Sequence, residues 1–319
     1  MDLRQKSILI TGATGFIGSN LTRHLVGIGI HPHIILRKES STWRINDVFS
    51  KVEPHYCDIT NKNDIENLIK QLKPQVIFHT AIYGGYAFQS DIKRILDVNF
   101  YGTINLLNAC EKIDYQLFVN SGSSSEYGIK DLPMKESDTL EPENDYGISK
   151  AASTLYCQAV ALREKKPLVS LRFFSPYGYF EEGSRLIPSV ILSCIKKEAI
   201  KCSSPEPVRD FIFIDDAIDA YIKTSEHIDK ISGEIINIGG GEQHSIGDVV
   251  NKIVKITGYK NGTEWNKITN ARTEPKMWQA DISKAKRIIG WRPKYGLDEG
   301  LNKAVEWLKE NAGLYETKS

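Results

Sequence analysis

Short apolar runs alternate with amphipathic stretches through the first half of the chain. The runs have the continuous apolar character of strands buried on both faces, and they lie at residues 7–11, 33–37, 76–81, 117–122 and 167–174. Between them, apolar positions recur at helical spacing over 61–72, after an Asn that can cap a helix, and over 95–112. This alternation predicts an α/β fold with a Rossmann-like, doubly wound parallel sheet.

The pattern changes after about Phe174. Loops rich in Gly, Pro and Ser follow, and strand-like runs reappear only at 209–214 and 234–240. We therefore expect a first domain over 1–174, to which the chain returns at about 211–240. A smaller C-terminal α+β lobe would comprise 175–210 and 241–319.

Composition narrows the class of protein. The chain of 319 residues has 25% charged residues and a formal net charge of +1, so we expect no general affinity for nucleic acid or membrane surfaces. It has neither a signal-peptide pattern nor a bilayer-spanning apolar run. The cysteines form no close pairs and the histidines show no metal-ligand spacing, which favours a reduced, cytoplasmic protein without a metal site. His79 is expected to be a packed strand-end residue.

Glycines mark the turn after the first predicted strand. Gly12, Gly15 and Gly18 are spaced three apart where strand becomes helix, in the sequence "TGATGFIG". Glycine permits a tight turn and close approach of backbone N–H groups to a phosphate, and a helix N-terminus favours negative charge. A glycine triplet alone can be a simple turn, but its place at the first strand-to-helix junction predicts a dinucleotide-binding domain.

Two cations stand where the second predicted strand ends. In dinucleotide-binding folds an acid near this position binds the ribose 2′-hydroxyl of NAD, but here the residue is Arg37, followed by Lys38. A guanidinium can bind the 2′-phosphate of NADP, so NADP is the expected cofactor and NAD the alternative. The other interpretation is that Arg37 and Lys38 are simply solvent-exposed residues at the end of a strand. Asp58, after the third strand, could bind the adenine amino group. Other side chains that could reach the phosphate are Ser40, Ser41 and Arg44.

A tyrosine and a lysine form a candidate reacting pair. Tyr146 and Lys150, in "YGISK", are four residues apart and would share one helical face. A free phenol has a pKa of about 10, and a nearby ammonium should lower it towards the range useful for proton transfer. Such a pair is common by chance, so its meaning depends on what surrounds it.

The surrounding segments make the chain resemble an extended short-chain dehydrogenase/reductase of the NAD-dependent epimerase/dehydratase family, whose members modify nucleotide sugars. The resemblance spans Gly12 to Trp291. It rests on "TGATGFIG", "VNFYGT", "SGSSSEYG", "YGISK", "RFFSPYG", "RDFIFIDD", "NIGGGEQHS" and "ADISKAKRIIGW".

The resemblance implies roles for particular residues. Tyr146 would be the catalytic acid/base, Lys150 would assist it and hold the nicotinamide ribose, and Ser123, four residues before Tyr127, would bind the reacting sugar oxygen. The implied cofactor-binding residues are Gly12, Thr14, Gly15, Phe16, Ile17, Gly18, Arg37, Lys38, Asp58, Ile59, Ala81, Asn99, Tyr146 and Lys150. The implied substrate-binding residues are Ser123, Ser124, Tyr146, Ser175, Arg209 and Arg272. Ser175 and Tyr179 depart from the family's usual Asn and Pro.

The sequence also favours some types of reaction over others. The family's 4,6-dehydratases carry acidic residues directly after the catalytic Ser or Thr, where this chain has Ser124 and Ser125; Glu126 is shifted by one and should point to the other face. Arg37 favours an NADPH-dependent reductase of a nucleoside-diphosphate 4-keto-6-deoxy sugar. A 4-epimerase with tightly bound NAD(P) is the alternative, and a dehydratase or a non-catalytic NADP sensor is disfavoured. The intact Ser123, Tyr146 and Lys150 argue against a sensor.

The expected partners are a nucleoside-diphosphate sugar and a second copy of the chain. The resemblance implies that Arg209 and Arg272 bind the diphosphate. It also implies that the helices at about 90–111 and 146–164 pair with those of another subunit in a homodimer. The aromatic loop Tyr83 to Phe88 could line the sugar pocket.

Overall fold

A seven-stranded parallel sheet forms the centre of the molecule. The structure is a computed structural model that describes residues 1–267 and 275–318. The sheet has the strand order β11-β6-β5-β4-β1-β2-β3. Its strands are β1 (Ile8–Thr11), β2 (His33–Leu36), β3 (Glu53–Tyr56), β4 (Val76–His79), β5 (Leu117–Ser123), β6 (Leu168–Phe173) and β11 (Ile235–Ile238). The predicted doubly wound Rossmann-like sheet is confirmed.

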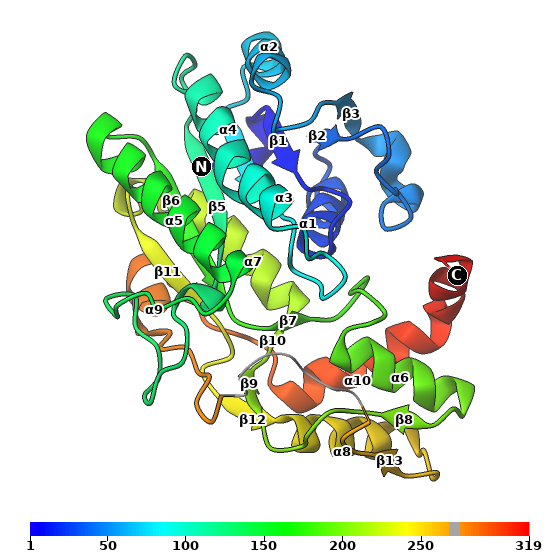
Figure 1. Cartoon of the computed structure of the whole chain (residues 1–319). Helices are drawn as coiled ribbons and strands as arrows, with labels where there is room; N and C mark the ends of the chain where they lie inside the picture. Colours follow the sequence, from blue (N-terminus) through cyan, green and yellow to red (C-terminus); the bar gives the residue numbers. More distant parts are fainter. Residues whose placement is uncertain (268–274, 319) are drawn as a thin grey trace.

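Helices cover both faces of this sheet (Figure 1). Side chains alternate along each strand, so Ile8 and Ile10 join the core on one face while Leu9 joins the core on the other. One face carries α1 (Phe16–Gly27) and α7 (Ile214–Glu226). The opposite face carries α2 (Lys62–Leu72), α3 (Ile92–Leu96), α4 (Gly102–Cys110) and α5 (Asp145–Glu164).

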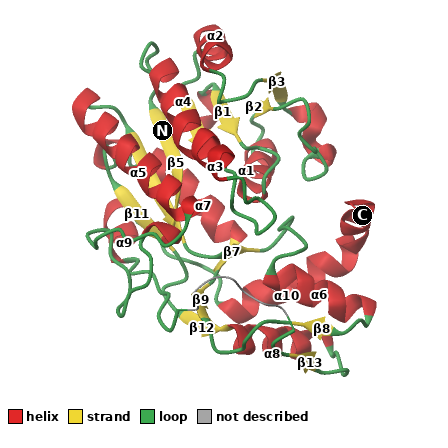
Figure 2. Cartoon of the chain, in the orientation of Figure 1, coloured by secondary structure: helices red, strands yellow, loops and turns green. Residues whose placement is uncertain are grey.

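A smaller lobe lies beyond the carboxyl ends of the strands. Its helices are α6 (Leu186–Lys196), α8 (Ile246–Thr257) and α10 (Leu297–Asn311), which pack on one another, as Figures 1 and 2 show. Short strands pair here: β8 (Ile200–Lys201) with β13 (Thr263–Glu264), and β9 (Val208–Asp210) with β12 (Gln243–Ser245). The short helix α9 (Ser283–Ile289) packs beside β11.

The segment 209–214 differs from the single strand expected there. It is divided between β9 and β10 (Ile212–Phe213), and β10 pairs with β7 (Pro176–Tyr177) rather than with the central sheet. The chain rejoins the sheet through α7 and β11. The helix expected over 95–112 is likewise composite, because a π-helical turn at Asp97–Tyr101 joins α3 to α4.

Other expectations concern single side chains. All five cysteines are buried and unpaired. His79 is buried, and its ring is hydrogen-bonded to Thr11 and Thr103, as expected for a packed strand end. Within residues 1–267 and 275–318 there is no helix with the length and apolarity needed to cross a bilayer.

Candidate active site

A cavity of about 620 Å³ lies at the carboxyl ends of the parallel strands. Ligands in open α/β sheets bind at this edge. The sequence-predicted residues that line it are Gly12, Thr14, Gly15, Phe16, Ile17, Gly18, Arg37, Ser40, Ser41, Arg44, Asp58, Ile59, Ala81, Ser123, Ser124, Tyr146, Ser175 and Arg209. Among the described residues, Lys38, Asn99 and Lys150 are not on its wall. Arg272 lies outside the described residues.

The turn between β1 and α1 has no room for a side chain at Gly12 or Gly18. Gly12 has a φ of +71°, and a Cβ there would stand 2.6 Å from the backbone nitrogen of Ala81. A Cβ on Gly18 would stand 2.2 Å from the carbonyl oxygen of Gly12. The predicted tight turn and close helix packing are therefore confirmed. The first turn of α1, beginning at Phe16, presents backbone N–H groups to the cavity wall and fits a dinucleotide pyrophosphate.

Arg37 directly follows β2 and lies on the cavity wall. Its side chain is 36% exposed, and Nε lies 3.4 Å from a carboxylate oxygen of Glu39. Its backbone N–H donates to Ser40 Oγ at 2.9 Å, which fixes the turn. Arg44 is different, because it is buried and donates to the carbonyl oxygens of Phe180 and Thr14 and to Glu182. Arg44 thereby holds the loop at 179–182 over the glycine turn, and it also lines the cavity.

Ser123 and Tyr146 meet on the wall. Ser123 ends β5, and its Oγ accepts a hydrogen bond from Ser125 N–H at 3.2 Å. Tyr146 lies in the first turn of α5, which Asn144 caps through Gly147 N–H. Both side chains line the cavity, and the Ser123 hydroxyl opposes the rise in the pKa of the Tyr146 phenol. Ser123 Oγ accepts from Ser125 N–H, and the Ser123 hydroxyl proton can be donated to an acceptor in the cavity.

The pKa of Tyr146 contradicts the sequence-based expectation. Burial raises it to about 12, although the hydrogen bond with Ser123 and the positive charge of Arg185 oppose the rise. The lysine one turn away was expected to lower it, but desolvation of the phenol outweighs nearby charge. Tyr146 is therefore protonated at neutral pH. A protonated phenol in this place can donate a proton to a ligand oxygen.

Lys150 lies behind the wall, where it is 2% exposed. Burial lowers its pKa, and the negative charge of Glu126 opposes that change. Asn99 supports the same helix: its Nδ2 donates to Ser149 Oγ at 2.9 Å. Asn99 also accepts from Tyr83 N–H at 2.8 Å, so one side chain links α5 to the aromatic loop.

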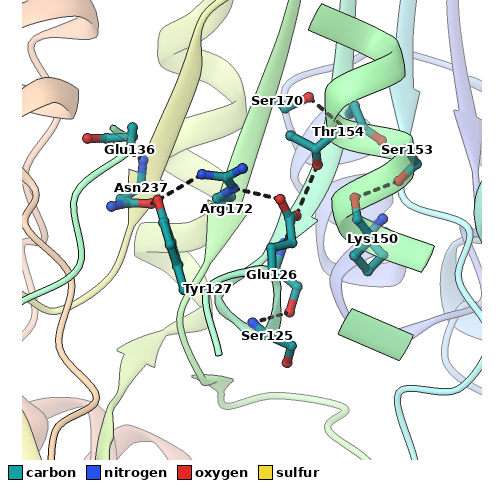
Figure 3. Close-up of polar contacts among 12 residues, drawn as sticks. Ser125, Glu126, Tyr127, Glu136, Lys150, Ser153, Thr154, Ser170, Arg172 and Asn237 are labelled. Carbon is teal, nitrogen blue, oxygen red and sulfur yellow. Dashed lines mark hydrogen bonds and ion pairs between the residues drawn. The ribbon is translucent and has the colours of Figure 1, made fainter. Parts of the chain in front are cut away.

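Glu126 is absent from the cavity wall, as predicted, but it ends a 3-10 turn at Ser124–Glu126 rather than lying on the strand-like segment that was expected. Its carboxylate is completely buried and lies between Arg172 on β6 and Thr154 on α5 (Figure 3). The side chains after Ser123 that do line the cavity are the hydroxyls of Ser124 and Ser125. The wall at this point therefore presents hydroxyl groups where the family's dehydratases carry acids.

The far end of the cavity belongs to the smaller lobe. Trp278 Nε1 donates to Ser124 Oγ at 3.2 Å, and the guanidinium of Arg209 lies 5.5 Å from the centre of the Trp278 ring. Tyr83 and Phe88 from the aromatic loop also line the cavity, as expected. This end thus combines aromatic surface with a cation, a combination that suits a nucleotide.

Several charged residues of the wall, Arg185 and Glu181 among them, were not predicted from the sequence. Arg185 Nε lies 3.7 Å from Glu181, and both side chains line the cavity. Glu181 is buried, and among the described residues its Oε2 has no hydrogen-bond partner. The charged cluster "EEGSR" at 181–185 was the available signal, but nothing in its spacing showed that the loop folds inwards.

Replacing Glu181 with Gln should stabilise the protein at alkaline pH. Burial raises the pKa of Glu181 to about 8, above its ordinary 4.5. The folded chain therefore keeps a proton that the unfolded chain releases, and stability falls as the pH rises from 4.5 through 8. Glu181→Gln removes this loss, so its free energy of unfolding, measured with urea, should exceed that of the wild type by about 4 kcal/mol at pH 8 and by little at pH 4.5.

The neighbouring carboxylate supplies the control for this experiment. Glu182 pairs with Arg44 at 3.0 Å, so Glu182→Gln should destabilise the chain at pH 8. A Glu181→Gln variant less stable than the wild type at pH 8 would contradict the account of this buried carboxyl.

Known proteins are similar over the whole chain. The sequence profile described as "NAD dependent epimerase/dehydratase family" matches residues 8–239. A UDP-glucose 4-epimerase of Lactobacillus helveticus is 26% identical, over 98% of this chain and 99% of the relative. A dTDP-4-dehydro-6-deoxyglucose reductase of Escherichia coli is 28% identical, over 97% and 99%. The structure of a UDP-glucuronic acid 4-epimerase from Bacillus cereus, in complex with UDP-glucuronic acid and NAD, superposes with a TM-score of 0.84 at 28% identity, covering 96% and 99%.

Proposed function

The chain belongs to the NAD dependent epimerase/dehydratase family, and within it we propose an NADPH-dependent oxidoreductase that reduces the 4-keto group of a nucleoside-diphosphate 4-keto-6-deoxy sugar. The broader class, a nicotinamide-dependent enzyme acting on nucleotide sugars, follows from the family and the relatives. The choice of reductase depends chiefly on one observation, the guanidinium of Arg37 on the cavity wall at the end of β2.

Arg37 favours a cofactor with a 2′-phosphate. A carboxylate in this position would repel such a phosphate, whereas a guanidinium can donate paired charge-assisted hydrogen bonds to it. The contact with Glu39 is long, at 3.4 Å, and partly exposed, so it holds the guanidinium only weakly. Cells supply reductive biosynthesis largely with NADPH, and a reductase consumes one equivalent for each turnover.

The residues of the wall fit the reaction. A bound NADPH would supply a hydride to the keto carbon, and the keto oxygen would then gain negative charge. Ser123 donates a hydrogen bond to that oxygen, which stabilises the charge. Tyr146 then gives it a proton. Reduction needs a proton donor, and the raised pKa of Tyr146 keeps the phenol protonated at neutral pH.

A 4-epimerase is the second candidate, because similar proteins include UDP-glucose and UDP-glucuronate 4-epimerases. The two reactions use the same wall but differ in what happens to the cofactor. An epimerase removes a hydride and returns it to the same sugar, so its cofactor is recycled.

Cofactor consumption distinguishes the candidates. Purified protein is mixed with NADPH and a panel of nucleoside-diphosphate 4-keto-6-deoxy sugars, and absorbance at the reduced nicotinamide band is followed. The proposal predicts a fall in absorbance proportional to the sugar added. Conversion of a UDP-hexose to its 4-epimer with no change in absorbance would support the epimerase instead.

We also propose that the substrate diphosphate binds beside Arg209, with Arg272 as a second cation. This placement is supported by the end of the cavity where Arg209 lies beside the Trp278 ring. The nicotinamide half would then lie towards Gly12, and the sugar would lie between, against Ser123 and Tyr146.

We further propose a homodimer through α4 and α5. Ile148, Leu155 and Leu162 recur every seven residues along α5 and are 48%, 50% and 63% exposed. Tyr101, just before α4, is 55% exposed. Large apolar side chains exposed along one helix indicate an interface.

Leu155→Glu should therefore produce a particle of one chain, 36.0 kDa, by light scattering, while the wild type has twice that mass. Tyr56→Glu is the control, because Tyr56 is 63% exposed but lies on β3, at the sheet edge away from β5 and β6 on which α5 packs, and this variant should remain dimeric. A monomeric wild type at micromolar concentration would refute the dimer.

A further inference from the structure

The carboxylate of Glu126 joins the elements that carry the reacting side chains. It accepts hydrogen bonds from the backbone N–H of Ser123 at 2.8 Å and from Thr154 Oγ1 at 3.0 Å. Arg172 Nε donates to its other oxygen at 2.6 Å. Ser123 ends β5 and Thr154 lies on α5, one turn beyond Lys150, so the carboxylate ties the strand to the helix (Figure 3).

Lys150 needs a negative charge near it. A buried ammonium loses its hydration, and only an opposite charge or hydrogen bonds restore the charged form. The groups whose charge acts on it are Glu126, which accepts from Thr154 one turn further along α5, Cys157 on the same helix and His79 on β4. Burial raises the pKa of the Cys157 thiol and lowers that of the His79 ring, so neither carries charge at neutral pH. Glu126 therefore supplies the negative charge.

Arg172 weakens the electrostatic effect of Glu126 on Lys150, because it binds the same carboxylate. Its guanidinium is 1% exposed and binds Glu126 on the side away from α5, as Figure 3 shows. It also donates to the hydroxyl of Tyr127 at 2.9 Å, and that hydroxyl donates to Asn237 on β11 at 2.7 Å. The carboxylate thus lies between two buried cations, of which Arg172 is fixed and Lys150 can lose its proton.

The same carboxylate also sets the direction of the Ser123 hydroxyl. Its bond to Ser123 N–H completes a capping box in which Ser123 Oγ accepts from Ser125 N–H. The turn after β5 therefore cannot rotate without breaking a buried charged hydrogen bond. This geometry keeps Ser123 aimed at Tyr146.

We propose that Glu126 is a positioning residue that keeps Lys150 charged and Ser123 aimed at Tyr146, and that Arg172 tunes this effect by sharing the carboxylate. The proposal deepens the proposed function, because the cofactor role of Lys150 rests on that assignment. It predicts opposite effects for the two members of one ion pair. A purely structural pair would give the same effect whichever member is removed.

The test is the pH dependence of NADPH binding, followed by the fluorescence of the bound nicotinamide between pH 6 and pH 10 without any sugar. Affinity should fall at alkaline pH as Lys150 loses its proton. In Glu126→Gln this fall should move to lower pH by about one unit, because the charge that favours the ammonium is gone. In Arg172→Gln it should move to higher pH, because Lys150 then faces an unshared carboxylate.

Two further variants keep the test decisive. Lys150→Met should abolish the alkaline fall, and a fall that persists would overturn the proposal. The double variant Glu126→Gln/Arg172→Gln removes both members of the ion pair, so neither is left without the other, and it should fold even where a single variant does not. Its alkaline fall should move to lower pH, as in Glu126→Gln. Shifts in the same direction for both single variants, or no shift in the double variant, would also overturn the proposal.

The outcomes separate this proposal from the proposed reaction. Opposite shifts in NADPH binding, in a protein that reduces no 4-keto sugar, would leave the role of Glu126 intact and refute the reductase. Sugar reduction without opposite shifts would leave the reductase intact and refute the role of Glu126.

Discussion

Tyr146→Phe should lower kcat for reduction of a 4-keto sugar by about 10³-fold, because general acid catalysis by a positioned side chain contributes about 10²- to 10⁴-fold. The phenol is the proton donor on the cavity wall, its pKa of about 12 keeps it protonated at neutral pH, and Phe keeps its shape. NADPH affinity should change little, since the ring remains in place. Stopped-flow kinetics with saturating cofactor measures both quantities.

Tyr156→Phe is the matched control for this prediction. Tyr156 is on the same helix, but its hydroxyl contacts Asn108 at 3.5 Å, on the side of α4. Its removal should leave kcat within about twofold, as is usual for substitutions away from a reacting centre. If Tyr146→Phe kept a tenth or more of the wild-type kcat, another group would have to supply the proton.

Arg37→Asp should raise the dissociation constant for NADPH by roughly 30- to 100-fold and improve that for NADH. The substitution removes a charge-assisted contact of about 2 kcal/mol and adds repulsion, and each 1.4 kcal/mol is about a factor of ten. Arg37 is placed for this contact because β2 ends at Leu36 and the next residue lies on the cavity wall. Fluorescence titration with both cofactors measures the change.

Lys38→Asp changes the net charge by the same amount one residue further on. Among the described residues Lys38 is not on the cavity wall, so this control should shift NADPH affinity by less than about fivefold at physiological salt. Equal losses in both variants would mean that long-range charge, rather than a contact at Arg37, determines the preference for NADPH.

The elements of the fold were predictable where one local pattern determines them. The strands at 8–11 and 76–79 are buried on both faces, so their apolar runs are continuous and bounded by turns. The glycine turn was predictable because Gly12 and Gly18 stand where any Cβ would meet backbone. The prediction of a single strand at 209–214 was wrong because the pairing of this segment depends on β7 and β12, which lie far away in the sequence.

The positions of the site residues could be predicted better than their electrostatics. Ser123 and Tyr146 were found from spacing and family resemblance, and both line the cavity. The direction of the Tyr146 pKa shift was wrong, because desolvation depends on loops that tertiary folding brings over the ring. Glu126 and Arg172 are 46 residues apart, so no local pattern pairs them. Glu181 was missed for the same reason: its burial comes from the folding of a loop.

The central claim is that hydride is transferred from the cofactor to the sugar and is not returned to the cofactor. The most direct test uses NADPH carrying deuterium at nicotinamide C4 on the transferred face, with mass spectrometry and NMR of the recovered nucleotide sugar. The account predicts one deuterium at sugar C4 for each NADPH oxidised. Interconversion of C4 epimers that leaves the deuterium on a protein-bound cofactor, with no NADPH consumed, would contradict it.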